Sequence, residues 1–212
     1  MQTSFSRRVL ATLLLSALVS CSGTKDNPYA AIKNPPMVKA RLQTVTLATD
    51  GATVAEQLQV KGYAPITFAS NYPVSNSVES SLWSVPEPVA ANAAHFKAAD
   101  AAEPDVRVLK MALAANSRAA DASVDKAFFE NVLGTGVPRL PAGLERTDKV
   151  RVQVWTYQIP DILAANKRFR EGGIPVVYDP VKITTAYLGD HKTMAIRAPD
   201  GTIVELVEAA TQ

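Results

Sequence analysis

The chain of 212 residues is poor in the side chains from which metal centres and disulfides are built, with one cysteine and two histidines. A single cysteine excludes an internal disulfide, and two histidines leave few ligands for a metal centre. Positive and negative charges nearly balance, because 22 Lys and Arg and 20 Asp and Glu give a net charge of +2. Without a basic stripe, nucleic acid is not an expected partner.

Two catalytic signatures are missing as well. The sequence contains no Gly-x-Ser-x-Gly elbow of the kind that presents a nucleophilic serine. The stretch Gly134-Thr135-Gly136 lacks the third glycine and the preceding strand of a dinucleotide-binding loop, so we interpret it as a turn. With 47% hydrophobic residues, the chain is nevertheless long enough for one sizeable core or two small fused modules.

Residues 1–20 have the organisation of an export signal. Arg7 and Arg8 precede an apolar run from Val9 to Val19. That run is shorter than the roughly 20 apolar residues of a transmembrane helix, and it fits the hydrophobic part of a signal peptide. It ends in Leu18-Val19-Ser20-Cys21, which resembles the lipobox of bacterial lipoproteins.

This resemblance implies cleavage before Cys21 and attachment of diacylglycerol to its thiol, with a further palmitate-type chain, which together anchor a protein stably in a membrane. The alternative is an ordinary secretory signal with an incidental cysteine. Ser22, rather than Asp, follows the cysteine, and by resemblance to enteric lipoproteins this favours the outer over the inner membrane of the cell envelope, facing the periplasm. Residues 21–38 are polar and contain proline, so we expect a flexible tether there.

Residues 39–210 are predicted to form the folded part. The first half contains an alternating strand and a helix that ends at a glycine, followed by a segment rich in proline and an Ala-rich stretch that fits a short helix or a pair of strands. A second convincing strand and an amphipathic helix come next. These elements are predicted over Arg41–Asp50, Gly51–Gly62, Tyr63–Pro88 (with a loosely assigned strand over Ser80–Val85), Asn92–Glu103, Val106–Leu113 and Asp121–Gly134.

The second half, about residues 148–210, gives clearer signals. A strictly alternating strand precedes a helix that opens at Pro160 or Asp161, and a closing hairpin turns at Pro199-Asp200-Gly201, where Asp-Gly favours a tight turn. We interpret this half as a β-α-β-β-β unit. Its elements are predicted over Val150–Tyr157, the helix to Glu171, Ile174–Tyr178, Thr184–Leu188, Lys192–Arg197 and Thr202–Val207.

The helix ending FREGGIPVV and the hairpin IRAPDGTIVELVE resemble the vicinal oxygen chelate (VOC) superfamily, which includes glyoxalase I, bleomycin- and fosfomycin-resistance proteins and extradiol dioxygenases. The hairpin matches the family's D-P-D-G-x-x-x-E-L pattern except at Ala198, which replaces the first Asp. DKAFFENVLG is similar to a helix of the family's first module. The resemblance implies an α+β fold of paired βαβββ modules after the lipoprotein signal peptide.

The first module can be placed in two registers. It starts at Arg41 with the Asp121–Gly134 helix lying between the modules, or it starts at Val106, where too few residues separate Gly134 from Val150 for three strands. Length favours the first register, although the sequence of the helix favours the second. In either register, two modules would curve together around a cavity, where such folds bind ligands.

Family members hold a divalent metal with His, Gln or Glu on the first strand of each module and a Glu on the last strand. By this resemblance the positions fall on Gln43, Gln153 and Glu205, while neither His95 nor His191 matches one. Amides are weak ligands, so this set would be poor for zinc or iron. His191 is expected at the surface or in a turn. Glu205 is alternatively a polar remnant facing solvent or a wet cavity.

Two aromatic residues of the second module, Trp155 and Tyr157, are candidate lining residues of an apolar ligand pocket, although aromatics at strand spacing more often belong to a plain core. The sequence therefore predicts an envelope-anchored lipoprotein whose VOC-like domain binds a small organic molecule without a full metal site. The alternatives are a metal-dependent enzyme of the same superfamily using the three positions named above, and a structural or assembly lipoprotein without a small ligand. No substrate or oligomeric state can be read from the sequence.

Overall fold

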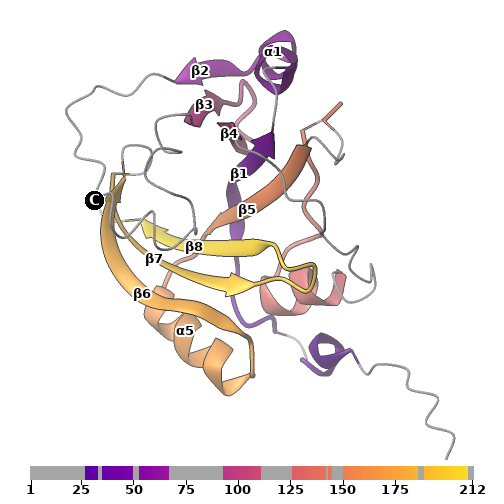
Figure 1. Ribbon diagram of the computed structural model, residues 1–212. Helices are drawn as coiled ribbons and strands as arrows, with labels where there is room; N and C mark the ends of the chain where they lie inside the picture. Colours follow the sequence, from indigo (N-terminus) through magenta and orange to yellow (C-terminus); the bar gives the residue numbers. More distant parts are fainter. Residues whose placement is uncertain are drawn as a thin grey trace, which may run out of the picture.

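A computed structural model of the chain describes residues 27–32, 35–49, 53–66, 93–110, 126–141, 143–144, 150–185 and 189–209 (Figure 1). Its order of elements repeats one unit twice. The first module consists of β1 (Arg41–Thr49), α1 (Thr53–Val60), β2 (Ala64–Ile66), β3 (Ala93–Lys97) and β4 (Asp105–Lys110). The second consists of β5 (Val150–Gln158), α5 (Ile162–Glu171), β6 (Val176–Thr185), β7 (Gly189–Arg197) and β8 (Ile203–Ala209).

The predicted α+β fold of paired βαβββ modules is thus confirmed, and the first module starts at Arg41. All eight strands belong to one mixed sheet in the order β2-β3-β4-β1-β5-β8-β7-β6. The modules meet where β1 and β5 pair antiparallel, and each of these strands also pairs in parallel with the last strand of its own module. Figure 1 shows β1 and β5 side by side in the middle, with β2 to β4 above and β6 to β8 below.

The sheet follows an approximate two-fold symmetry. Val45 of β1 pairs with Trp155 of β5, and a half-turn about this point exchanges the two antiparallel strands. The pairing slips at two places, because Gln43 in β1 and Gln153 in β5 have no partner opposite them in the register. Both positions are β-bulges, in which one extra residue interrupts the ladder.

The apolar core contains residues of both modules. Val45 and Leu47 of β1 are fully buried together with Trp155 and Tyr157 of β5, as are the inward residues of both helices. Alternation along each strand explains this arrangement, because residues two apart share one face of a sheet. The helix residues that close the core are Val54 and Leu58 of α1 and Ile162, Ala165 and Phe169 of α5.

Helix α5 begins as its sequence predicts. The Asp161 carboxylate accepts a hydrogen bond from the backbone N–H of Ala164 at 2.9 Å, which satisfies one of the free donors of the first turn. Glu208 of β8 accepts a second one, from the N–H of Ile162 at 2.7 Å. Glu208 also pairs with Lys192 at 2.6 Å, and this hydrogen bond lowers the pKa of the glutamate. The helix is therefore tied to β8 at its N-terminus.

Two predictions about the extent of elements need correction. The stretches Ile174–Tyr178 and Thr184–Leu188 were expected as separate strands, but Val176–Thr185 form the single strand β6, whose pairing with β7 shifts around Tyr178 and Val181. Of the predicted Asp121–Gly134 helix, Lys126 and Ala127 are α-helical and the π-helix η2 (Phe128–Val132) follows, so the helical residues end at Val132. The N-terminal part of the predicted helix and the expected strand Ser80–Val85 lie outside the described residues. Asn92–Glu103, left open between helix and strands, contributes β3.

Within the segment expected to be a tether up to residue 38, the described residues 27–32 and 35–38 lie against the domain. The segment forms a 3-10 helix, η1 (Pro28–Ala31), whose Tyr29 ring meets the Phe128 ring edge-on with centroids 5.2 Å apart. Val38 is buried. Gly134, which has a φ of +68°, lies so close that a Cβ there would come within 2.5 Å of the Val38 carbonyl oxygen, so a glycine is required. Cys21 and the signal segment lie outside the described residues.

No helix among the described residues is long and apolar enough to cross a membrane.

Candidate functional site

The two faces of β8 have different surroundings. Glu208 contacts the N-terminus of α5, so the face of β8 that also carries Val204 and Leu206 is turned toward the helix. Glu205 therefore points to the opposite face of the sheet. Its side chain is nevertheless buried, with only 6% of its surface exposed. Glu205 is therefore not a solvent-facing carboxylate, which was one of the alternatives that the sequence left open.

Both carboxylate oxygens of Glu205 accept a hydrogen bond from a threonine on a neighbouring strand. Thr156 of β5 donates to Oε2 at 2.9 Å, and Thr193 of β7 donates to Oε1 at 2.9 Å. The Tyr178 hydroxyl lies 3.0 Å from the Thr193 hydroxyl. Since the Thr193 proton is given to Glu205, Tyr178 must be the donor in that contact. A chain of hydroxyls thus leads from half-buried Tyr178 to the carboxylate.

The same face continues into the first module. Thr44 of β1 is opposite Thr156 in the ladder, and Thr46 lies two residues further on. Both are buried. We call the five side chains Thr44, Thr46, Thr156, Thr193 and Glu205 the threonine face. Its polar lining contrasts with the apolar opposite face, and buried polar groups are costly to keep unless they are hydrogen-bonded.

Gln43 reaches the edge of this face. Its side-chain amide donates to the Gln158 carbonyl oxygen at 3.0 Å. Gln158 follows Thr156 by two residues on β5 and so lies on the same face, roughly 7 Å further along the strand. Gln153 occupies the second bulge and is half-buried. The structure thus joins Gln43 to Gln158, and neither this hydrogen bond nor the two that Glu205 accepts from threonines connects Gln43, Gln153 and Glu205 to one another.

Trp155 and Tyr157 lie on the opposite face from Glu205. They alternate with Val154 and Thr156 along β5 and are buried in the core to 1% and 0% exposure. Burial raises the pKa of the Tyr157 hydroxyl well above its usual range. These two residues therefore do not share a surface with the threonine face, and a ligand-lining role for them stays a prediction.

His191 was expected at the surface or in a turn, and this is wrong. It lies in β7 with 4% exposure, and its Nδ1 is 2.8 Å from the Gly189 carbonyl oxygen. The carbonyl can only accept, so Nδ1 is the donor in this contact. His191 precedes Thr193 by two residues and so lies on the threonine-face side of β7.

Arg107 occupies in the first module the position that Glu205 occupies in the second. The half-turn about Val45 and Trp155 exchanges Thr46 with Thr156, and these pair with Arg107 and Glu205 respectively. The last strands of the two modules therefore present opposite charges at equivalent positions on one face. Arg107 in turn pairs with His95 across β3 and β4. Burial, and then the charge of Arg107, lower the pKa of His95 to about 4, so the imidazole is neutral at neutral pH.

A metal of the kind held by VOC proteins fits these residues poorly. The three predicted positions supply one carboxylate and two amides, and amide oxygens are weak ligands for zinc or iron. Both oxygens of Glu205 already accept hydroxyl protons. Among the described residues, no three His, Cys, Asp or Glu side chains come together as a possible cation site.

Sequence reasoning missed the partners of Glu205. Thr156 and Thr193 are ordinary strand residues, and Arg107 belongs to an alternating strand in which a charge is unremarkable. The signal that was available is positional. Thr44 and Thr46 stand two residues apart on the first predicted strand, and alternation places such residues on one face.

Several solved structures resemble this chain at low sequence identity. Methylmalonyl-CoA epimerase from Mycobacterium tuberculosis is 16% identical, with 85% of this chain and 95% of that chain covered and a TM-score of 0.45. A Mn(II)-bound glyoxalase from Novosphingobium aromaticivorans is 15% identical over 80% of this chain and 40% of that one, with a TM-score of 0.43.

A glyoxalase/bleomycin resistance protein/dioxygenase superfamily member from Vibrio splendidus 12B01 is 12% identical over 80% and 99% of the two chains, with a TM-score of 0.40. No protein-family model matches the sequence, and no curated protein matches it either. At these identities and TM-scores, the element order and strand pairing described above remain the basis of the fold assignment.

Proposed function

We propose that this chain is an envelope-anchored lipoprotein whose VOC-like domain binds a small organic molecule at the threonine face without a full metal site. The observation that carries the proposal is the buried Glu205 carboxylate, with each oxygen fixed by a threonine hydroxyl. Removing a carboxylate from water costs free energy that hydrogen bonds only partly recover. A face that served packing alone would be expected to be apolar, as the opposite face is.

The chemistry of this face suits a polar ligand. The oxygen atoms of Glu205 and of the threonine hydroxyls offer hydrogen-bond acceptors in fixed positions, because neighbouring strands hold their side chains. Arg107 adds a positive charge at the equivalent position of the other module. A few convergent polar groups on a rigid scaffold are what fixes the orientation of a small ligand in a binding site.

The binding proposal is tested by differential scanning fluorimetry of the purified full-length protein against a library of small polar metabolites. A binder should raise the melting temperature of the wild type, and a Glu205→Gln variant should lose most of that shift. A Lys182→Gln variant, altered on an exposed residue of β6, is the matched control and should keep the full shift. Uniform silence of the library, or equal shifts in all three proteins, would contradict binding at this face.

The competing hypothesis is a metal-dependent enzyme of the VOC superfamily that uses Gln43, Gln153 and Glu205. Elemental analysis of the purified protein distinguishes the two. Stoichiometric divalent metal that disappears in a Glu205→Ala variant would overturn the metal-free proposal. A third hypothesis, a structural or assembly lipoprotein, is favoured if no ligand and no metal is found.

The anchor is proposed from the sequence of the Leu18–Cys21 lipobox. Mass spectrometry of the N-terminal peptide of the membrane-extracted protein should show cleavage before Cys21 and an acylated, diacylglycerol-modified cysteine. A Cys21→Ser variant should lose the modification and leave the membrane fraction. Separation of inner and outer membranes by density then tests the expected outer-membrane location. A free, unmodified Cys21 would reject the anchor and leave the binding proposal standing.

A further inference from the structure

The N-terminal segment bound to the domain restricts how the protein can sit at a membrane. We call residues 27–32 and 35–40 the strap. Its backbone N–H groups at Met37, Val38 and Ala40 donate to the carbonyl oxygens of Asn131, Val132 and Leu133 at 2.9 to 3.1 Å. These bonds attach the strap to the segment that links the two modules.

The strap is held at its beginning as well as at its end. The Asn131 amide donates to the Tyr29 carbonyl oxygen at 2.9 Å, and the Tyr29 ring packs edge-on against Phe128. Arg168 of α5 donates to the Met37 carbonyl oxygen at 2.7 Å. The strap therefore contacts both η2 and α5. It cannot detach from the domain and extend the tether unless several of these contacts break together.

Only residues 22–26 separate Cys21 from Asn27, where the strap begins. A fully extended chain covers at most about 3.6 Å per residue, so six steps span no more than roughly 22 Å. This reach is much shorter than the tether expected from the sequence, which ran to residue 38. The anchor therefore keeps Asn27 within that distance of the lipid.

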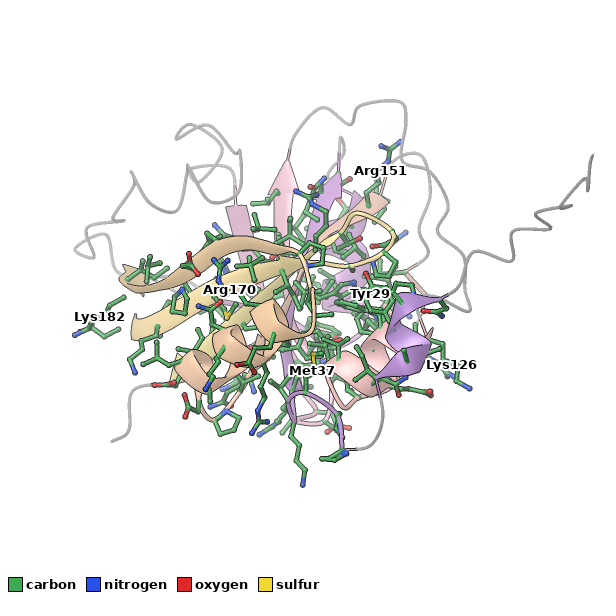
Figure 2. The ribbon with its side chains drawn as sticks, turned by 90° about the horizontal axis from the view of Figure 1, so that it is seen from below. Tyr29, Met37, Lys126, Arg151, Arg170 and Lys182 are labelled. Atoms are coloured by element: carbon green, nitrogen blue, oxygen red, sulfur yellow. The ribbon has the colours of Figure 1, made fainter. Side chains whose placement is uncertain are left out.

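Resting on the proposed anchor at Cys21, we infer that the domain docks against the bilayer with the η1 and η2 side, which we call the strap face. The strap face consists of η1, η2 and the exposed side chains of Lys126 and Glu130. Figure 2 shows Lys126 and Tyr29 on the same side of the molecule, whereas Lys182 of β6 lies at the opposite edge. The occupant of the strap face is the lipid surface itself, and the β6 end points away from it.

The inference is tested by resonance energy transfer from the full-length lipidated protein to acceptor-labelled lipid headgroups in vesicles. Two single variants, Lys126→Cys and Lys182→Cys, each receive one donor dye, because Cys21 is blocked by its lipid. They are matched, since each removes one exposed lysine. Transfer should be several-fold more efficient from position 126 than from position 182.

A third protein tests the cause of the orientation. A Gly/Ser insertion of about 20 residues after Ser22 adds roughly 25 Å of root-mean-square reach, and transfer from position 126 should fall towards that from position 182. Equal transfer from both positions in the protein without the insertion, with Cys21 shown by mass spectrometry to be lipidated, overturns the inference and leaves the anchor intact. Absence of lipid on Cys21 overturns both.

Discussion

The two modules share one fold and differ in what they place on the same face of the sheet. The second module supplies Glu205, buried and fixed by Thr156 and Thr193. The first supplies Arg107 at the equivalent position, beside a neutral His95. Duplicated architecture therefore does not imply duplicated chemistry, because strand pairing fixes only where a side chain points and leaves its charge free to change.

The helices differ in the same way. Leu58 of α1 and Phe169 of α5 occupy equivalent positions, and both are fully buried. The carbonyl oxygen of each accepts a hydrogen bond from the backbone N–H of the residue five positions later, Tyr63 for Leu58 and Ile174 for Phe169. The second module fills this position with the larger side chain. More apolar surface is thus buried under α5 than a leucine would bury.

The largest expected effect comes from replacing Leu58 or Phe169. Phe169→Ala should lower the free energy of unfolding by about 4 kcal/mol and Leu58→Ala by about 3 kcal/mol, from lost burial and the cavity left behind. Urea denaturation followed by circular dichroism and by tryptophan fluorescence measures both. Because β1 and β5 join the modules in one continuous sheet, each variant should shift one common transition. Two separate transitions would show that the modules unfold independently.

Acid should destabilise the protein through the first module. The pKa of His95 is lowered in the folded state to about 4, against about 6.5 in the unfolded chain. The unfolded state binds more protons between these values, so the contribution to stability is complete above pH 6.5 and is lost as the pH falls toward 4. The loss amounts to about 3 kcal/mol.

The variant His95→Gln tests the acid effect, because glutamine does not titrate in this range. Its free energy of unfolding should change much less between pH 7 and pH 4 than that of the wild type. Ala195, which pairs with Glu205, stands where His95 stands in the first module, so the second module has no corresponding titration at that position. An identical pH dependence of variant and wild type would contradict the burial argument.

The charged positions themselves give the next comparison. Glu205→Ala leaves two buried threonine hydroxyls without their acceptor and should cost about 2 to 3 kcal/mol. Arg107→Met, which keeps most of the side-chain volume of a half-buried residue, should cost about 1 kcal/mol. Equilibrium unfolding at pH 7 measures both. If Arg107→Met were the more damaging variant, the polar centre of the site would belong to the first module.

The smallest effect is at the start of α5. Asp161→Ala removes the hydrogen bond to the Ala164 N–H and should lower the free energy of unfolding by about 1 kcal/mol. Asp161→Asn keeps an oxygen acceptor and should be nearly neutral, which separates the cap from other roles of the residue. Thermal denaturation at neutral pH is sufficient to detect the difference. Equal losses in both variants would contradict a capping role.

Much of the fold was accessible from the sequence because it depends on local rules. Strict alternation predicted β5, the Asp-Gly pair predicted the closing turn before β8, and Asp161 marked the start of α5. The merger of two expected strands into β6 was missed, because the strand continues between them with a pairing that shifts around Tyr178 and Val181. The strap was missed for another reason: its polar sequence gives no sign of the backbone groups on η2 that hold it.

The sequence alone determined most of the order of elements and the alternation of side chains along each strand, and it predicts the lipobox at Cys21. Only the tertiary structure decided which elements meet. Thr156 and Thr193 became partners of Glu205 because β5, β8 and β7 are adjacent in the sheet, and Arg107 became its counterpart because β1 and β5 pair about Val45 and Trp155. Such contacts join residues far apart in the chain, and local propensity carries no information about them. The sequence shows Glu205 only as a carboxylate within an apolar predicted strand, and the sheet supplies its two hydrogen-bond donors.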